Sequence, residues 1–335
     1  MERETVTDNA PLVLAVPSKG RLQENAMAFF ARAGMSFVQS RGSREYRGAI
    51  AELPDVEVAF LSASEIVGQI QRGEAHLGVT GEDLVREQIS DAANSVEMLT
   101  PLGFGNANVV VAVPQGWIDV RTMADLDDVA ADMRQRHGRK LRVATKYINL
   151  TRRFFAERSV SDYRIVESLG ATEGAPASGS ADMIVDITTT GATLTANALK
   201  ILDDGTILQS EANLVASMRA NWSARARHAV SAMLVRIAAE EEARRLREVR
   251  ASIGTVDTNF IVDIAARFEA RLPFGPIAPG GIITIHCPRA KVFDLAEYLS
   301  ARGVKDVTVR TLDYVFRSDN PLLLKLGTRL AALSH

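Results

Sequence analysis

Short apolar runs alternate with helix-like stretches along the first two thirds of the chain, and this alternation predicts an α/β architecture. The runs are rich in valine, leucine and alanine, which is typical of parallel strands buried on both faces. The clearest runs are residues 12–16, 56–61, 109–113, 141–144 and 183–185. A helical stretch at 22–33 follows the first run and ends at Gly34. We therefore expect buried strands that are linked by helices.

Two parts of this region follow the same order of small, polar and apolar residues. Residues 73–81 parallel residues 179–187, and Lys19 follows its strand as Lys146 follows the strand at 141–144. This likeness predicts two periplasmic-binding-protein-like α/β lobes with an active cleft between them. The predicted bounds are 1–105 for the first lobe and 106–195 for the second, with the first lobe completed by about 196–222, where a strand at 207–216 returns to it.

The last third of the chain has a different pattern. Residues 222–249 are alanine-rich with an apolar stripe, which predicts one long helix whose residues 223–249 connect the parts. Residues 250–335 are predicted to form a small ferredoxin-like or ACT-like α+β domain with an extra C-terminal helix at 321–335. The expected β-α-β-α-β order is 247–253, 257–271, 281–287, 292–302 and 306–312.

Composition narrows the class of protein. The chain has 335 residues, 47% hydrophobic and 24% charged, with a formal net charge of −2, so a large core and two or three domains are expected. Near-neutral charge argues against a nucleic acid or an anionic membrane as the main partner. Cys287 is the only cysteine, which excludes an internal disulfide and favours the cytoplasm. Residues 1–10 lack the apolar core of a signal peptide, and no apolar run approaches membrane-spanning length.

The stretch 181–194 carries the clearest candidate chemistry. A short strand leads into a threonine-rich turn at 188–191 and then into a predicted helix at 192–202. Backbone N–H groups at such a turn attract anions, so the pattern predicts a phosphate site. Asp182 and Asp186 share one strand face, and Asp186 lies at the carboxyl edge, where it can accept sugar hydroxyls or hold Mg²⁺ through water. The alternative is an ordinary strand–turn–helix with threonine caps.

Other polar residues stand at turns that follow strands. Lys19, Gly20 and Arg21 follow the first strand. The charges of Lys19 and Arg21 can bind a nucleotide phosphate or the pyrophosphate of a second substrate, or they can lie solvated on a surface loop. Glu173, in a loop of small residues, can accept a hydroxyl or an amine, and an exposed loop glutamate is equally compatible with the sequence. His76 is expected to be a satisfied histidine at the surface of a lobe.

The motif Asp-(x)3-Asp-(x)3-Thr-Gly-Ala-Thr-Leu at 182–194 resembles the phosphoribosyl-pyrophosphate loop of ATP phosphoribosyltransferase, the first enzyme of histidine biosynthesis. Further blocks of that family occur in the right order, and Glu173, Pro176 and Asn197 lie in the last of them. The resemblance covers about residues 11–220. The other blocks are 13–22, 73–84, 102–114, 143–155 and 170–199.

The resemblance implies a pentosyltransferase that joins N1 of ATP to C1 of phosphoribosyl pyrophosphate and releases pyrophosphate. Mg²⁺ would be carried by the substrates, with no protein-only metal site. It implies catalytic roles for Asp182, Asp186, Glu173 and Lys19. It implies phosphoribosyl-pyrophosphate binding by Asp182, Asp186, Thr188, Thr189, Thr190, Gly191, Ala192, Thr193 and Leu194. It implies ATP binding by Lys19, Gly20, Arg21 and Lys146.

Long-form members of the family carry a C-terminal domain that binds histidine, so the resemblance also implies histidine and AMP as inhibitors and a homo-oligomer between a dimer and a hexamer. The chain departs from the family at His76, where members carry Asp, and at 64–68, which includes Glu65. The first half of its C-terminal domain is also shortened. Three alternatives remain: a cytosolic small-molecule binding or regulatory protein of the same fold, a phosphoribosyltransferase with another acceptor, and a catalytically silent partner.

Overall fold

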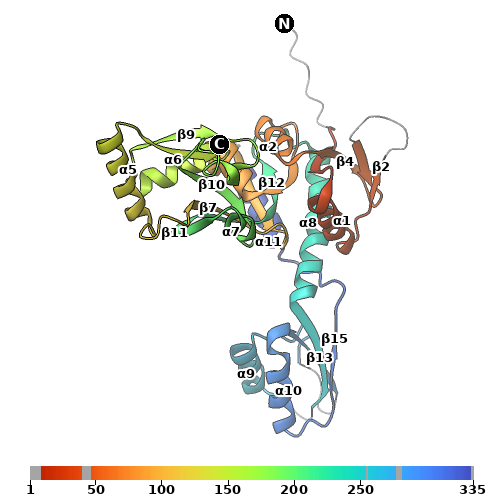
Figure 1. Ribbon diagram of the computed structural model, residues 1–335. Helices are drawn as coiled ribbons and strands as arrows, with labels where there is room; N and C mark the ends of the chain where they lie inside the picture. The colour runs from red at the N-terminus through yellow and green to blue at the C-terminus, as the bar shows by residue number, and fades with distance from the viewer. Residues whose placement is uncertain (1–8, 40–46, 254–255, 277–280, 333–335) are drawn as a thin grey trace. The chain divides into compact units, whose positions relative to one another are not determined.

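The computed structural model describes residues 9–39, 47–253, 256–276 and 281–332, and these form two compact units (Figure 1). The larger unit holds the chain up to Phe29, Phe37–Arg227 and the end of the chain from Leu326. The smaller unit holds Phe30–Ser36 and His228–Lys325. Two α/β sheets form the larger unit and a three-stranded sheet lies in the smaller one, which confirms the predicted fold class. None of the helices in these ranges is long and apolar enough to cross a membrane.

The first lobe is built on a seven-stranded sheet with the order β2-β3-β4-β1-β5-β12-β6. Strand β1 lies inside this sheet and pairs in parallel with β4 and β5, and its side chains are almost all buried, as the apolar run predicts. The strands are β1 (Leu12–Pro17), β2 (Phe37–Gln39), β3 (Arg47–Ile50), β4 (Leu53–Leu61), β5 (Leu77–Gly81), β6 (Val96–Pro101) and β12 (Ala212–Ser217).

Four helices connect these strands in the described part of the lobe. The structure of one of them, α2 (Ala63–Arg72), shows the role of Glu65. The helices are α1 (Gly20–Arg32), α2 (Ala63–Arg72), α3 (Glu82–Gln88) and α4 (Ala92–Ser95). Glu65 stands in the first turn of α2, where its carboxylate accepts the backbone N–H of Ser62 at 2.8 Å and Ser62 Oγ accepts the N–H of Glu65 at 3.3 Å. These bonds lower the pKa of Glu65. The segment that departs from the family pattern is therefore a capping box that starts a helix.

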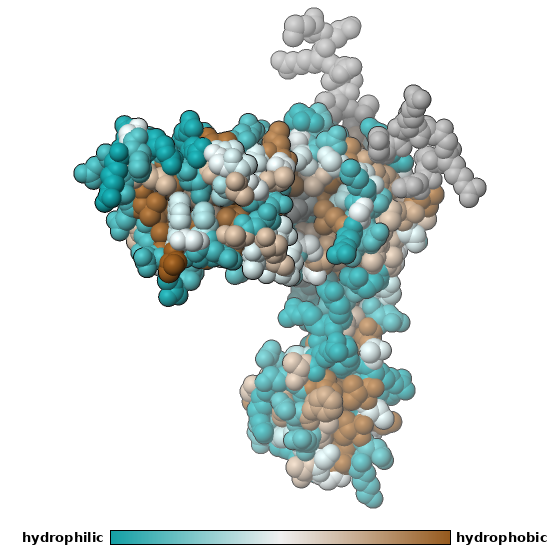
Figure 2. Space-filling view, viewed as in Figure 1, coloured by the Kyte–Doolittle hydropathy of each residue, from teal (hydrophilic) through white to brown (hydrophobic). Residues whose placement is uncertain are grey.

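The second lobe is built on a five-stranded sheet with the order β11-β7-β10-β8-β9. Strand β10 runs parallel to β8 and antiparallel to β7. Figure 2 shows hydrophilic side chains over α5, as expected for a polar peripheral helix. The elements are β7 (Ala107–Pro114), α5 (Met123–His137), β8 (Leu141–Thr145), α6 (Ile148–Glu157), β9 (Tyr163–Glu167), the 3₁₀ turn η1 (Thr172–Gly174), β10 (Met183–Thr188), α7 (Ala192–Ala196) and β11 (Leu199–Ser210).

The chain changes sheets at Glu211. Strand β11 pairs with β7 of the second lobe up to Ser210, whereas β12 pairs with β5 and β6 of the first lobe from Ala212 onward. The single returning strand expected at 207–216 is therefore two strands in different sheets, and the return to the first lobe is shorter than the expected 196–222. The other domain boundaries stay predictions.

The small sheet has β13 between β14 and β15, both antiparallel to it, so the predicted β-α-β-α-β order is confirmed. The long helix ends at Arg245 rather than at residue 249, because the next residues pair with β14 and Val249 is buried in that sheet. The C-terminal helix is confirmed as far as Ala332, and residues 333–335 lie outside the described residues. The elements are α8 (Ala224–Arg245), β13 (Leu246–Ser252), α9 (Thr258–Phe268), β14 (Ile282–Pro288), η2 (Arg289–Lys291), α10 (Val292–Ala301), β15 (Val307–Arg310) and α11 (Pro321–Ala332).

His76 is a structural residue of the first lobe, as expected, but it is buried and does not lie at the surface. Its Nδ1 accepts the N–H of Val13 at 3.1 Å, so Nε2 carries the hydrogen and donates to the carbonyl oxygen of Asn221 at 2.9 Å. The ring lies edge-on to Trp222, with 5.1 Å between the ring centroids. Burial lowers the pKa of His76, so the fold holds a neutral imidazole.

We expect the free energy of unfolding to fall as the pH drops below 6.5, the ordinary pKa of histidine. In this range His76 binds a proton in the unfolded chain more readily than in the folded one, because its folded pKa is lowered. Between pH 7.5 and 5.5 this one group costs about 1 kcal/mol. Urea unfolding at several pH values should show a smaller decrease for H76N, in which an amide oxygen replaces Nδ1. Parallel pH profiles for the two proteins would contradict the prediction.

Candidate active site

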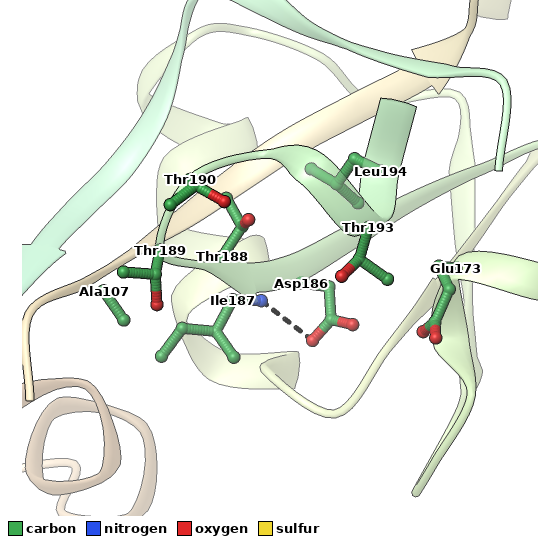
Figure 3. A pocket seen from close by; sticks show the side chains of 9 residues that line it. All are labelled: Ala107, Glu173, Asp186, Ile187, Thr188, Thr189, Thr190, Thr193 and Leu194. Carbon is green, nitrogen blue, oxygen red and sulfur yellow. Dashed lines mark hydrogen bonds between the residues drawn. The ribbon is translucent and has the colours of Figure 1, made fainter. Parts of the chain in front are cut away.

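A cavity of about 310 Å³ opens at the carboxyl end of β10 (Figure 3). Its wall comes from the second lobe alone, mostly from the end of β10, the following loop and the start of α7. The lining residues are Ala107, Glu173, Asp186, Ile187, Thr188, Thr189, Thr190, Thr193 and Leu194. The predicted threonine loop, Asp186 and Glu173 therefore meet at one cavity.

The loop after β10 offers hydrogen-bond donors to this cavity. Thr188 Oγ1 accepts the N–H of Gly191 at 2.9 Å, which closes the turn, and Gly191 has a φ of 76°, which glycine adopts without strain. Thr189 and Thr190 are exposed. Within the described ranges, the N–H groups of Thr189, Thr190 and Thr193 donate to no protein acceptor. An anion in the cavity can therefore be bound by backbone amides and threonine hydroxyls.

Helix α7 is much shorter than predicted. It spans five residues rather than 192–202, because Ala198 takes a left-handed conformation (φ 54°) and β11 begins at Leu199. Gly191 and Ala192 are not among the residues that line the cavity. One turn of helix contributes little dipole, so the donors of the loop matter more than the helix.

Two carboxylates and one cation act on each other at the cavity. Asp186 is half-buried and accepts the N–H of Ile187 at 2.8 Å. Burial raises the pKa of Asp186, the bond from Ile187 and the charge of Lys146 lower it, and the charge of Glu173 raises it. Lys146 is exposed at the carboxyl end of β8, the strand beside β10. The site therefore combines the carboxylates of Asp186, near the end of β10, and Glu173, in the 3₁₀ turn η1, with a nearby ammonium group.

Several known proteins have sequences similar to this one. A family model described as ATP phosphoribosyltransferase matches residues 62–239, more than half of the chain. The chain belongs to the ATP phosphoribosyltransferase family. An ATP phosphoribosyltransferase of Nitrobacter winogradskyi is 61% identical over 94% of this chain and 97% of its own length. One from Afipia carboxidovorans is 58% identical over 96% of this chain and 99% of its own length.

A solved structure supports the fold of this family for the chain. The ATP phosphoribosyl transferase (HisG:HisZ) complex from Thermotoga maritima contains a chain with 27% identity and a TM-score of 0.52. The similarity covers 68% of this chain and 95% of that one. The family resemblance predicted from the sequence is thus confirmed.

Asp182 requires a correction, because the structure separates it from the cavity. It precedes β10 and Asp186 lies near the other end of that strand, so the two are about 13 Å apart along the chain. Its carboxylate is bound by Arg139 at 2.7 Å and Arg142 at 2.9 Å, and its side chain is 8% exposed. Hydrogen bonds from both arginines outweigh burial and lower the pKa of Asp182 far below its usual range. Asp182 therefore fastens β10 to β8 and does not share a site with Asp186.

The expected cations of the first lobe lie at the carboxyl end of β1, outside the lining of the cavity. Lys19 and Arg21 are exposed, and Gly20 opens α1 with a φ of 70°. The expected cleft between the lobes, and the ATP-binding role of these residues, stay predictions.

Sequence reasoning missed Ala107 and Ile187, whose apolar side chains help to line the cavity. Ala107 lies within a block that resembles the family, but nothing in its type indicates a site. No group of three or more His, Cys, Asp and Glu side chains in the described ranges is arranged to hold a metal ion. Asp186 and Glu173 supply two carboxylates, which suits Mg²⁺ that keeps water and substrate oxygens as its other ligands.

Asp182, which directly precedes β10, and Asp186, which lies within it, should differ in their effect on stability. We expect D182N to lower the free energy of unfolding by about 2 kcal/mol, because it breaks a largely buried ion pair. D186N should change it by less than about 1 kcal/mol, because the fold already disfavours the charged form of Asp186. Urea denaturation at pH 7 measures both values. Equal losses for the two variants would contradict the assignment of Asp182 as the structural member.

Proposed function

We propose that the chain transfers the phosphoribosyl group of phosphoribosyl pyrophosphate to N1 of ATP and releases pyrophosphate, which is the first step of histidine biosynthesis. The observation that carries this proposal is the cavity of β10, where a donor-rich threonine loop adjoins two carboxylates. Family membership supplies the identity of the two substrates.

In this proposal the loop binds the 5-phosphate of the sugar. The N–H groups of Thr189, Thr190 and Thr193 donate to phosphate oxygens, and threonine hydroxyls add further donors. Short side chains let the phosphate approach the backbone. Asp186 accepts the ribose hydroxyls, since it lies directly before the loop on the same strand.

The remaining charges serve the reacting carbon and the leaving group. C1 of ribose passes through an oxocarbenium-like state, and the carboxylates of Asp186 and Glu173 stabilise its positive charge. Lys146 neutralises phosphate oxygens of the departing pyrophosphate, and Lys19, Gly20 and Arg21 contact phosphates of ATP. The protein thereby orients two bound substrates and needs no nucleophilic side chain.

The pyrophosphate group of the substrate would carry Mg²⁺, which when bound would supply charge neutralisation at the phosphate oxygens. Asp186 and Glu173 would hold it through water. Asp182 has no part in this assignment, because its carboxylate is occupied by two arginines.

The proposal extends to regulation and assembly. We propose that histidine inhibits the enzyme through the small domain of β13–β15, that AMP is a second inhibitor, and that the protein assembles as a homo-oligomer between a dimer and a hexamer. We also propose that it acts in the cytoplasm, which the single, buried Cys287 suits. A histidine inhibition curve and sedimentation of the purified protein test regulation and assembly directly.

The decisive experiment is to incubate the purified chain with ATP, phosphoribosyl pyrophosphate and Mg²⁺. We expect pyrophosphate release and a phosphoribosyl-ATP product in mass spectrometry only when both substrates are present. Binding without turnover would indicate a sensor or a silent partner, and turnover with a different base would indicate a phosphoribosyltransferase with another acceptor.

The loop assignment predicts a difference between two threonines of one short helix. Thr193 lines the cavity, whereas Thr195 lies outside its lining and donates to the carbonyl oxygen of Gly191 at 3.2 Å. T193V should weaken phosphoribosyl-pyrophosphate binding by about 1.5 kcal/mol, because it removes a hydrogen bond to a charged phosphate. T195V, the matched control, should leave the affinity in calorimetry almost unchanged. Equal affinities of T193V and the unmodified protein would show that the phosphate does not bind at this loop.

A further inference from the structure

Two buried carboxylates of the first lobe have no role in the function proposed above. Asp83 and Glu87 lie one turn apart on α3 and are 5% and 9% exposed. No lysine or arginine in the described parts of the chain forms an ion pair with either. Burial of an uncompensated carboxylate is costly, so each must be stabilised by hydrogen-bond donors.

The donors to Asp83 come from the second lobe and from the point where the chain changes sheets. The Tyr147 hydroxyl donates to Asp83 at 2.8 Å, and Ser210 Oγ donates to it at 2.8 Å. Burial and the charge of Asp83 raise the pKa of Tyr147, so its hydroxyl keeps the proton that it donates. Tyr147 is fully buried, which fixes the ring in this place.

Glu87 caps a helix of the second lobe. Its carboxylate accepts the backbone N–H groups of Asn149 and Leu150, each at 2.9 Å, and its carbonyl oxygen accepts Asn149 Nδ2 at 2.9 Å. These amides lie in the first turn of α6, whose own N-cap residue, Tyr147, supplies no side-chain acceptor. The cap that a helix normally takes from its own sequence is therefore supplied by the first lobe.

The residues held in this way adjoin the cavity. Lys146 directly precedes Tyr147, and its Nζ lies 5.1 Å from the centre of the Tyr147 ring. Strands β8 and β10 pair in parallel with Ala144 beside Ile184, and continuing this register brings Lys146 level with Asp186. The short turn between β8 and α6 therefore sets the position of an ammonium group at the cavity.

We propose that Asp83 and Glu87 are positioning residues, which hold the turn at Lys146 and Tyr147 so that Lys146 faces the phosphates of the substrates beside Asp186. This inference rests on the function proposed above. It follows that Asp83 and Glu87 of the first lobe contribute to catalysis through hydrogen bonds to the second lobe, without lining the cavity. A displacement of about 1 Å in a charged group at a reacting centre can cost about 100-fold in rate.

The test is a set of double-mutant cycles on the full chain, with kcat/KM for phosphoribosyl pyrophosphate as the readout. We expect E87Q and Y147F each to lower kcat/KM by about 10- to 100-fold. In the K146A background the same changes should lower it by less than about twofold, because the group that they position is gone. E82Q is the matched control, since Glu82 pairs with Arg86 on the same helix and should have no effect in either background.

Far-UV circular dichroism and urea unfolding establish that each variant is folded, and Y147F, which removes one oxygen from a buried ring, decides the matter if E87Q does not fold. Equal factors in the two backgrounds would overturn the proposal, because the residues would then act independently of Lys146. Full activity of E87Q and Y147F would also overturn it. Full activity of K146A would overturn this proposal but not the proposed function, whereas failure of the unmodified chain to form phosphoribosyl-ATP would overturn the proposed function itself.

Discussion

The parallel pairing of β8 with β10 is the interaction on which the site depends. At the amino end of the pair, the carboxylate of Asp182 binds Arg139 and Arg142, and its N–H donates to the carbonyl oxygen of Arg142 at 2.9 Å. These contacts fix the register of the two strands. At the other end the same register brings the turn after β8 beside the loop after β10, so a structural ion pair determines where the chemical groups meet.

Hydrogen bonds to two buried carboxylates form part of the contact between the lobes. Apolar surfaces can slide against each other, whereas hydrogen bonds to the carboxylates of Asp83 and Glu87 are satisfied in only one arrangement. The two buried carboxylates therefore define how the two lobes are arranged, and they add little net stability. A cavity lined by one lobe can thus depend on the other lobe for the placement of Lys146.

The sequence predicts much of this architecture and part of its site. Apolar runs identified the central strands, and the threonine loop with Asp186 and Glu173 was predicted at the cavity that the structure shows. Asp182 was wrongly assigned to the site. The two-residue period of a strand predicts which face of the sheet a side chain lies on, but not at which end of the strand it lies. The helix after Gly191 was predicted too long, because pairing of β11 with β7 overrides the helical preference of residues 197–202. Hydrogen bonds such as that from Tyr147 to Asp83 join residues far apart in the chain, and no local pattern indicates them.

The change of sheets at Glu211 has a consequence for the order of folding. Strand β12 lies between β5 and β6, although the whole second lobe separates it from them in the chain. A ribosome therefore releases β5 and β6 long before their common neighbour exists. The second lobe, whose strands are contiguous from β7 to β11, can close its sheet first during synthesis. The seven-stranded sheet of the first lobe therefore lacks the strand between β5 and β6 until residues 212–217 are synthesised.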